Sequence, residues 1–264
     1  LTSFLSEKLG PMLEGCRLLK LQNQLPQIGD TSPDITPEYL DSVLGIHTEK
    51  TGIQDDFARY DSNGFSILVH VNVSGHPIIA SHAHHDSGSP VVIYKGVLLL
   101  LDPGQKSYQL EDSANREATA HNSIQIDSRP MEVWPRKFHG KKYLRYRCGP
   151  APKLQLKPDG IYVELNGYST HNIQVSRKFS VEKNRFKIDQ FVQGSGTYKI
   201  SIRLNLLDSS VATILWPEGG IHSSTAISFS KRYGENQSAV QWLWEMNVAL
   251  PWQGTIYVNP EGEL

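Results

Sequence analysis

The chain has 264 residues, and its 26 Lys and Arg residues nearly balance 27 Asp and Glu residues. Global charge therefore gives no reason to expect binding to nucleic acid or to a membrane surface, and attraction to an anionic partner would need a local patch. A chain of this length buries roughly 70–75% of its unfolded surface, and no apolar run approaches the roughly 18 residues of a membrane-spanning helix.

The first 45 residues predict helices and loops. Apolar residues fall on one helical face, and Gly10-Pro11 predicts a break into two helices; the apolar residues are Leu5, Leu9, Met12, Leu13, Cys16 and Leu19. Thr36 is a helix N-cap followed by a proline, and Gly45 ends that short helix. Because the sequence opens on Leu1 without a signal peptide, we expect a fragment of a longer protein.

Beyond about residue 57 the pattern changes to short blocks of β-forming residues. In residues 198–206 the apolar side chains keep a strict period of two, which indicates a sheet with one face on a core. Tight turns are predicted at Lys95-Gly96, Pro158-Asp159-Gly160 and Glu182–Arg185. Many such strands without long helices between them predict a mainly β fold, a large antiparallel sandwich of supersandwich type with a short helical N-terminal segment.

Residues 81–86, Ser-His-Ala-His-His-Asp, are the densest cluster of metal-ligating side chains. In a strand, His82, His84 and Asp86 would share one face. Imidazole and carboxylate groups together suit zinc and related divalent ions. Asp102, which ends an apolar strand, and His121, which precedes another, could complete the site. Three histidines within four positions favour a metal or catalytic role over a chance polar loop.

The same cluster partly resembles the His-x-His-x-Asp-His signature of metallo-β-lactamase-like hydrolases. Ser87 stands where the last histidine should be, and those proteins alternate strands with helices, unlike this chain. A metal-dependent hydrolase that uses His82, His84 and Asp86 directly is therefore the less favoured alternative. It would keep an open coordination position on the metal.

A basic run is the second functional feature. Seven basic residues crowd twelve positions without an acid, and Tyr143 and Tyr146 are interleaved. Such a run can bind carboxylates or sulfates of a polyanionic chain, and in a strand its alternation would give one cationic face. The predicted substrate-binding residues are Arg136, Lys137, Lys141, Lys142 and Arg145. An ordinary solvated hairpin remains an equal alternative.

Four tryptophans could stack on sugar rings, although most tryptophans of a sandwich lie in its core. They are Trp134, Trp242, Trp244 and Trp252.

In order and spacing, three motifs resemble the heparinase II/III-like polysaccharide lyase family. They are the histidine-rich loop at 82–86, Asp102-Pro-Gly104 after an apolar hairpin, and Ala-His-Asn-Ser at 120–123. The resemblance covers nearly the whole chain. It implies a sandwich domain over residues 46–264, preceded by a remnant of an (α/α) toroid over residues 1–45.

The resemblance also implies roles for individual residues. Family members cleave uronic-acid-containing glycans by β-elimination, and His82 matches the histidine that lines the catalytic cleft. His84, Asp102 and His121 match the ligands of a structural divalent metal, with zinc expected and calcium or manganese as alternatives. Asn122 is expected to hold its loop. The match leaves the roles of His85 and Asp86 open.

The family's catalytic tyrosine and its partner asparagine or histidine come from the toroid, which we expect this chain to lack. The resemblance thus implies the metal-binding C-terminal part of a lyase, inactive alone, with an acidic polysaccharide as partner and the periplasm or cell exterior as location. A non-catalytic glycan-binding or scaffold module of a surface-polysaccharide system is the alternative. Such a module would keep the metal site without turnover.

Overall fold

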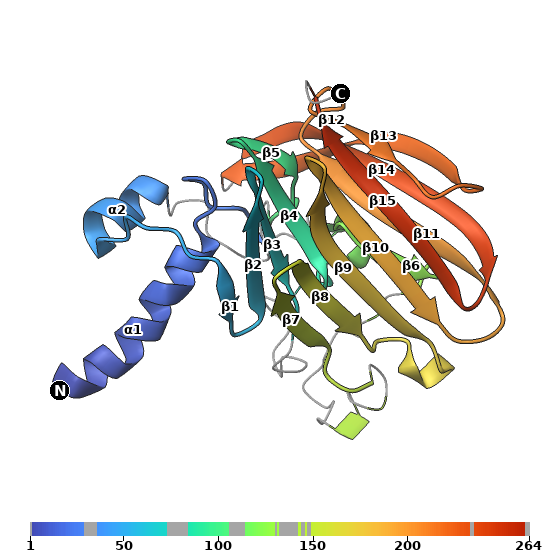
Figure 1. Cartoon of the computed structure of the whole chain (residues 1–264), viewed down its shortest axis with the longest axis horizontal. Helices are drawn as coiled ribbons and strands as arrows, with labels where there is room; N and C mark the ends of the chain where they lie inside the picture. The colour runs from blue at the N-terminus through green and yellow to red at the C-terminus, as the bar shows by residue number, and fades with distance from the viewer. Residues whose placement is uncertain are drawn as a thin grey trace.

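The fold is a sandwich of two antiparallel β-sheets with a helical N-terminal segment at one side (Figure 1). The computed structural model describes residues 2–28, 36–72, 84–105, 114–129, 131, 142–143, 146, 149–232 and 235–261. The architecture confirms the predicted fold class. Neither helix in this part of the chain is long and apolar enough to cross a membrane.

The larger sheet has nine strands in the order β1-β2-β3-β4-β5-β11-β14-β13, with β6 also paired to β11. Their bounds are β1 Gly52–Gln54, β2 Phe57–Ser62, β3 Phe65–His70, β4 Ser89–Tyr94, β5 Val97–Leu100, β6 Ile124–Ile126, β11 Thr197–Leu206, β13 Ile221–Arg232 and β14 Glu235–Ala249.

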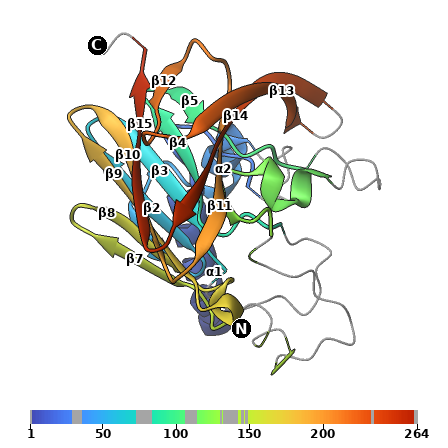
Figure 2. The same cartoon turned by 90° about the vertical axis from the view of Figure 1, so that its right-hand side faces the viewer.

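The smaller sheet has six strands in the order β12-β15-β10-β9-β8-β7 and lies against the larger one, as Figure 2 shows from the side. Their bounds are β7 Lys153–Lys157, β8 Gly160–Leu165, β9 Gln174–Glu182, β10 Arg185–Gln193, β12 Ala212–Leu215 and β15 Trp252–Pro260. The connections include the short 3-10 helices η3 (Ala118–Ala120) and η4 (Ser169–His171).

The main core fills the space between the sheets. The period-two residues of β11 are fully buried there, and Ile200 and Leu204 belong to the same apolar cluster as Phe179 and Ile188 of the smaller sheet. Burial of one such side chain contributes roughly 1.5–3 kcal/mol. The hairpin turns follow the sequence too: Lys95 and Gly96 both have positive φ, the geometry that matches the twist of the flanking strands.

A second apolar cluster covers the outer face of the larger sheet. Leu18, Leu21 and Ile28 of the N-terminal segment pack there against Val91 and Ile93 of β4. Every residue of β4 is consequently buried. This double burial explains why the block at 91–94 is continuously apolar instead of alternating.

The predicted break at Gly10-Pro11 is wrong. The first helix, α1 (Thr2–Leu19), runs through Pro11 as one element. Proline removes the one helical hydrogen bond that its own N–H would donate to the carbonyl of residue 7, and the other bonds continue the helix. The side-chain amide of Gln54 makes a separate contact from outside the helix by donating to the carbonyl of Pro11. Leu9 and Met12 of the predicted apolar stripe are exposed, Met12 by 66%.

The second helix, α2 (Pro37–Leu44), begins and ends where the sequence predicts. The Thr36 hydroxyl accepts a hydrogen bond from the Tyr39 N–H, and Gly45 closes the helix in the left-handed conformation.

A buried arginine ties the N-terminal segment to the sheet. Arg59 of β2 donates to the Glu49 carboxylate and to the Lys20 carbonyl. Glu49 also accepts the backbone N–H groups of Gln22 and Asn23. Partial burial alone would raise the pKa of Glu49, but these hydrogen bonds outweigh burial and lower it.

We predict that Glu49→Gln lowers the free energy of unfolding by about 1–2 kcal/mol at neutral pH, because it removes an ionised acceptor from a buried donor. With a folded-state pKa below its unfolded value, Glu49 stabilises the fold above the unfolded pKa and loses this effect as the pH falls through the folded value. Urea titrations at several pH values should therefore show the two proteins converging in acid. The exposed Glu218→Gln variant is the control; a constant difference at all pH values would contradict the prediction.

Candidate metal centre

Strand pairing brings three segments of the chain to one place. His84 precedes β4 and Asp102 follows β5, so the β4–β5 hairpin places both at the same end. His121 follows η3 and precedes β6, which pairs with β11. Because β5 also pairs with β11, the segments of Asp102 and His121 lie side by side.

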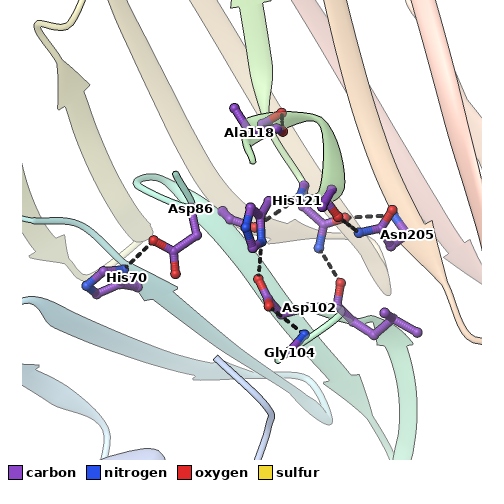
Figure 3. Close-up of polar contacts among 12 residues, drawn as sticks. His70, Asp86, Asp102, Gly104, Ala118, His121 and Asn205 are labelled. Carbon is purple, nitrogen blue, oxygen red and sulfur yellow. Dashed lines mark hydrogen bonds and ion pairs between the residues drawn. The ribbon is translucent and has the colours of Figure 1, made fainter. Parts of the chain in front are cut away.

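The structure brings the three predicted ligands together. One ligand atom from each of His84, Asp102 and His121 lies within 4.8 Å of the others. All three side chains are buried, His121 completely. The Nδ1–H of His121 donates to Asp102 Oδ2 at 2.7 Å (Figure 3). The ring centroids of His84 and His121 are 5.5 Å apart. No other group of three such side chains in the described ranges lies this close.

The electrostatics of the cluster fit a cation. Burial lowers the pKa of His121, but the adjacent Asp102 carboxylate outweighs burial, and the net pKa is raised. Asp102 Oδ1 accepts the Gly104 N–H at 3.0 Å, which orients the carboxylate. His121 Nε2 is buried and has no hydrogen-bond partner within the described part of the chain. Two imidazoles and one carboxylate are a typical zinc donor set.

Residues 84–86 form an irregular loop, so the period-two argument that placed His84 and Asp86 on one face of a strand is wrong. Asp86 instead pairs with Nδ1 of His70 at 3.1 Å (Figure 3). Burial would raise the pKa of Asp86, but His70 outweighs burial and lowers it. His85 is also buried, which lowers its pKa to about 4.

Sequence reasoning missed His70. This residue ends β3 and lies opposite Ser89 of β4, and its carbonyl accepts the Gly88 N–H at 2.7 Å. The register of β3 against β4 was the signal that could have found it. Together, the Gly88 bond and the Asp86 pair join the two ends of the chain segment between β3 and β4.

Asn122 holds the cluster's loop, as predicted for it. Its fully buried amide donates to the carbonyls of Pro90 and Leu101 at 2.7 and 2.9 Å, and its Oδ1 accepts the Asn205 N–H at 2.7 Å. One side chain thereby connects β4, the end of β5 and β11 beside His121.

We predict that Asn122→Leu lowers the free energy of unfolding by about 3–5 kcal/mol, because it leaves two buried carbonyls and one buried N–H unpaired at about 1–3 kcal/mol each. Urea unfolding monitored by tryptophan fluorescence would measure the loss. Asn247→Leu, an exposed change in β14, should cost under about 0.5 kcal/mol. Equal stability of the two variants would refute the anchoring role of Asn122.

The other predicted site residues are only partly placed. His82, Arg136, Lys137, Lys141 and Arg145 lie outside the described residues. Lys142, Tyr143 and Tyr146 are exposed and helical, so the strand predicted for them is wrong. The alternation of basic and other residues in this run is compatible with a strand but does not require one, so it could not exclude a helical turn.

Three of the four tryptophans weighed for sugar stacking lie in or against the core, as is usual for a sandwich. The rings of Trp244 and Trp252 stack at 5.7 Å, and Trp244 is fully buried. Trp242 packs at the edge of the core and is half-buried, and Trp134 lies outside the described residues.

The double antiparallel sheet and its buried His-Asp-His cluster define a β-sandwich domain with a candidate metal centre. The family described as heparinase II/III-like, C-terminal, matches residues 51–248. The chain belongs to this family. A search among curated proteins finds no match.

Solved structures share the fold over almost the whole chain. A heparinase III is 14% identical with a TM-score of 0.72, covering 98% of this chain and 47% of its own. The heparan sulfate lyase HepC from Pedobacter heparinus is 12% identical with a TM-score of 0.68 and covers the same 98% and 47%. The chain thus spans about half the length of these proteins.

Proposed function

We propose that this chain is the metal-binding part of a polysaccharide lyase that cleaves uronic-acid-containing glycans by β-elimination. Membership of the heparinase II/III-like family supports lyase chemistry on a polysaccharide. One structural observation carries the proposal: the convergence of His84, Asp102 and His121 into one buried cluster. A chance polar loop would not bury two imidazoles and a carboxylate against each other.

The cluster's proposed role is structural. His84, Asp102 and His121 would hold the ion, and a divalent ion bound there supplies a cross-link among three chain segments. Zinc fits the two imidazoles better than calcium, which prefers oxygen ligands only; manganese remains the second alternative. Because His82 lies two residues before His84, a fixed His84 restrains the position of His82.

The residues of this chain would supply only some of the groups that the elimination reaction needs. The reaction removes the proton next to the uronate carboxylate, forms a double bond and expels the 4-linked sugar oxygen. It needs neutralisation of the carboxylate, a base, and an acid for the leaving group. We assign His82 to the carboxylate side of this cleft, where an imidazole titrating near neutrality can neutralise charge or accept the proton.

The remaining groups would come from a helical domain that precedes this chain, since the chain spans about half of its solved relatives. We therefore propose that the chain alone is inactive. Its proposed partner is an acidic polysaccharide, and its proposed location is the periplasm or the cell exterior. The basic side chains proposed to bind the polysaccharide are Arg136, Lys137, Lys141, Lys142 and Arg145.

The alternatives differ in what the cluster does. A non-catalytic glycan-binding module would bind the metal and the glycan but would not cleave the glycan. The metal-dependent hydrolase would use Asp86 as a ligand, but Asp86 is not among the three residues whose ligand atoms converge, and its carboxylate pairs with His70 instead.

We predict that the chain binds one zinc ion and that binding stabilises the fold by about 2.7 kcal/mol at a free zinc concentration 100 times the dissociation constant. Calorimetric titration and thermal unfolding with zinc or a chelator would measure both quantities. His121→Ala and Asp102→Ala should abolish binding, whereas the exposed His47→Ala should not. Zinc-independent unfolding of the unaltered chain would refute the metal centre.

We predict that the isolated chain releases no unsaturated uronate from acidic polysaccharides, while the longer protein with its helical domain does, as followed by ultraviolet absorbance. In that longer protein His82→Ala should lower kcat at least about 100-fold, as expected for loss of an acid–base group, and should leave zinc content unchanged. His222→Ala, an exposed change in β13, is the control. Robust turnover by the isolated chain would contradict the division between two domains, and a longer protein that binds but never cleaves would favour the non-catalytic module.

A further inference from the structure

A buried arginine reaches from the smaller sheet to the segments of the candidate metal centre. Arg177 lies in β9 and its side chain is only 2% exposed. Its Nη1 donates to two backbone carbonyls, that of Gly88 at 2.6 Å and that of Asn122 at 2.8 Å. The two carbonyls lie 34 positions apart in the sequence, and both accept a hydrogen bond from the same nitrogen atom of Arg177.

Those two carbonyls belong to the segments that carry the histidine ligands. Gly88 lies four residues after His84 in the irregular stretch before β4, and Asn122 follows His121 directly. The stretch approaches the smaller sheet closely at Gly88: this glycine has a positive φ, and a Cβ there would lie 3.0 Å from a methyl carbon of Leu165 in β8. Arg177 therefore fixes the distance between two of the three ligand segments from the opposite sheet.

The arginine has no counter-charge among the described residues. Neither its Nε nor its Nη2 has a hydrogen-bond partner there, and burial lowers the pKa of Arg177 to about 9. A buried cation without an ionic partner costs several kcal/mol of folding free energy. The contact of the guanidinium with the Phe179 ring, 5.0 Å from its centroid, offsets only part of this cost. A hydrophobic residue would fill the same place in the core without that cost. Within the described part of the chain, the only hydrogen bonds that the buried guanidinium makes are those to Gly88 and Asn122.

We propose that Arg177 is a positioning residue of the metal centre, which it serves by holding the His84 and His121 segments at the separation that a shared ion needs. The proposal rests on the metal binding proposed above. Within the described part of the chain Arg177 donates no hydrogen bond to a ligand side chain and acts through the two backbone carbonyls. Groups that orient metal ligands in this indirect way typically change metal affinity 10–100-fold when they are removed.

The test is zinc affinity, measured by competition with a chromophoric chelator on the whole chain. Arg177→Met keeps the apolar stem and removes the donors, so zinc should bind about 10–100-fold more weakly. Arg177→Lys keeps the charge but loses the planar donor geometry, and affinity should fall by a smaller factor. The lysine variant also serves if the methionine variant does not fold.

Arg59→Met is the matched control, because Arg59 is equally buried and also donates to a backbone carbonyl, but in the N-terminal segment. It should lower the melting temperature and leave zinc affinity unchanged. If the Arg177 variants lose thermal stability yet bind zinc as tightly as the unaltered chain, Arg177 has a packing role only and the proposal is overturned. If the unaltered chain binds no zinc, the metal centre itself fails, and the assignment of Arg177 fails with it for that separate reason.

Discussion

Burial of the Asp102–His121 pair is the constraint on which the rest of the site depends. A carboxylate and an imidazole removed from water must be hydrogen-bonded or must hold an ion, because an unpaired buried charge costs several kcal/mol. The 2.7 Å contact between them satisfies part of that demand. The N–H of Gly104 satisfies a further part by donating to Asp102 Oδ1, and the amide of Asn122 fixes the surrounding loop through the Pro90 and Leu101 carbonyls.

The antiparallel topology explains why these neighbours are available. A hairpin returns the chain to its starting edge, so the segments before β4 and after β5 meet without any long connection. Pairing of β5 and β6 with β11 adds the His121 segment. The cluster is therefore a consequence of strand register, and a one-residue slip of β6 would turn its side chains to the other face of the sheet.

Features set by local sequence patterns could be predicted from the sequence, whereas features set by contacts between distant residues could not. The strand at 198–206 and the turn at Lys95-Gly96 are local patterns, and both predictions are confirmed. The grouping of His84 with Asp102 and His121 came from motif resemblance. No local sequence pattern indicates the roles of His70 and Arg177. His70 pairs with Asp86, 16 positions away, and Arg177 donates to Asn122, 55 positions away. The strand predicted around Asp86 failed for a related reason: tertiary partners, rather than periodicity, hold that loop.

All three candidate metal ligands come from the sandwich domain alone. Metal binding and catalysis can therefore depend on different parts of such a protein. All three candidate ligands and Asn122 lie in loops next to strands of the larger sheet, and Arg177 lies in β9 of the smaller one, whereas the solved relatives are about twice as long as this chain. Metal holding then requires only the sandwich to fold. Elimination requires in addition an acid and a base placed within hydrogen-bond reach of the sugar. For the proposed function this means that changes in the sandwich core would act on the candidate metal centre through strand register, whereas changes at His82 would act on the proposed turnover and leave the cluster of ligands intact.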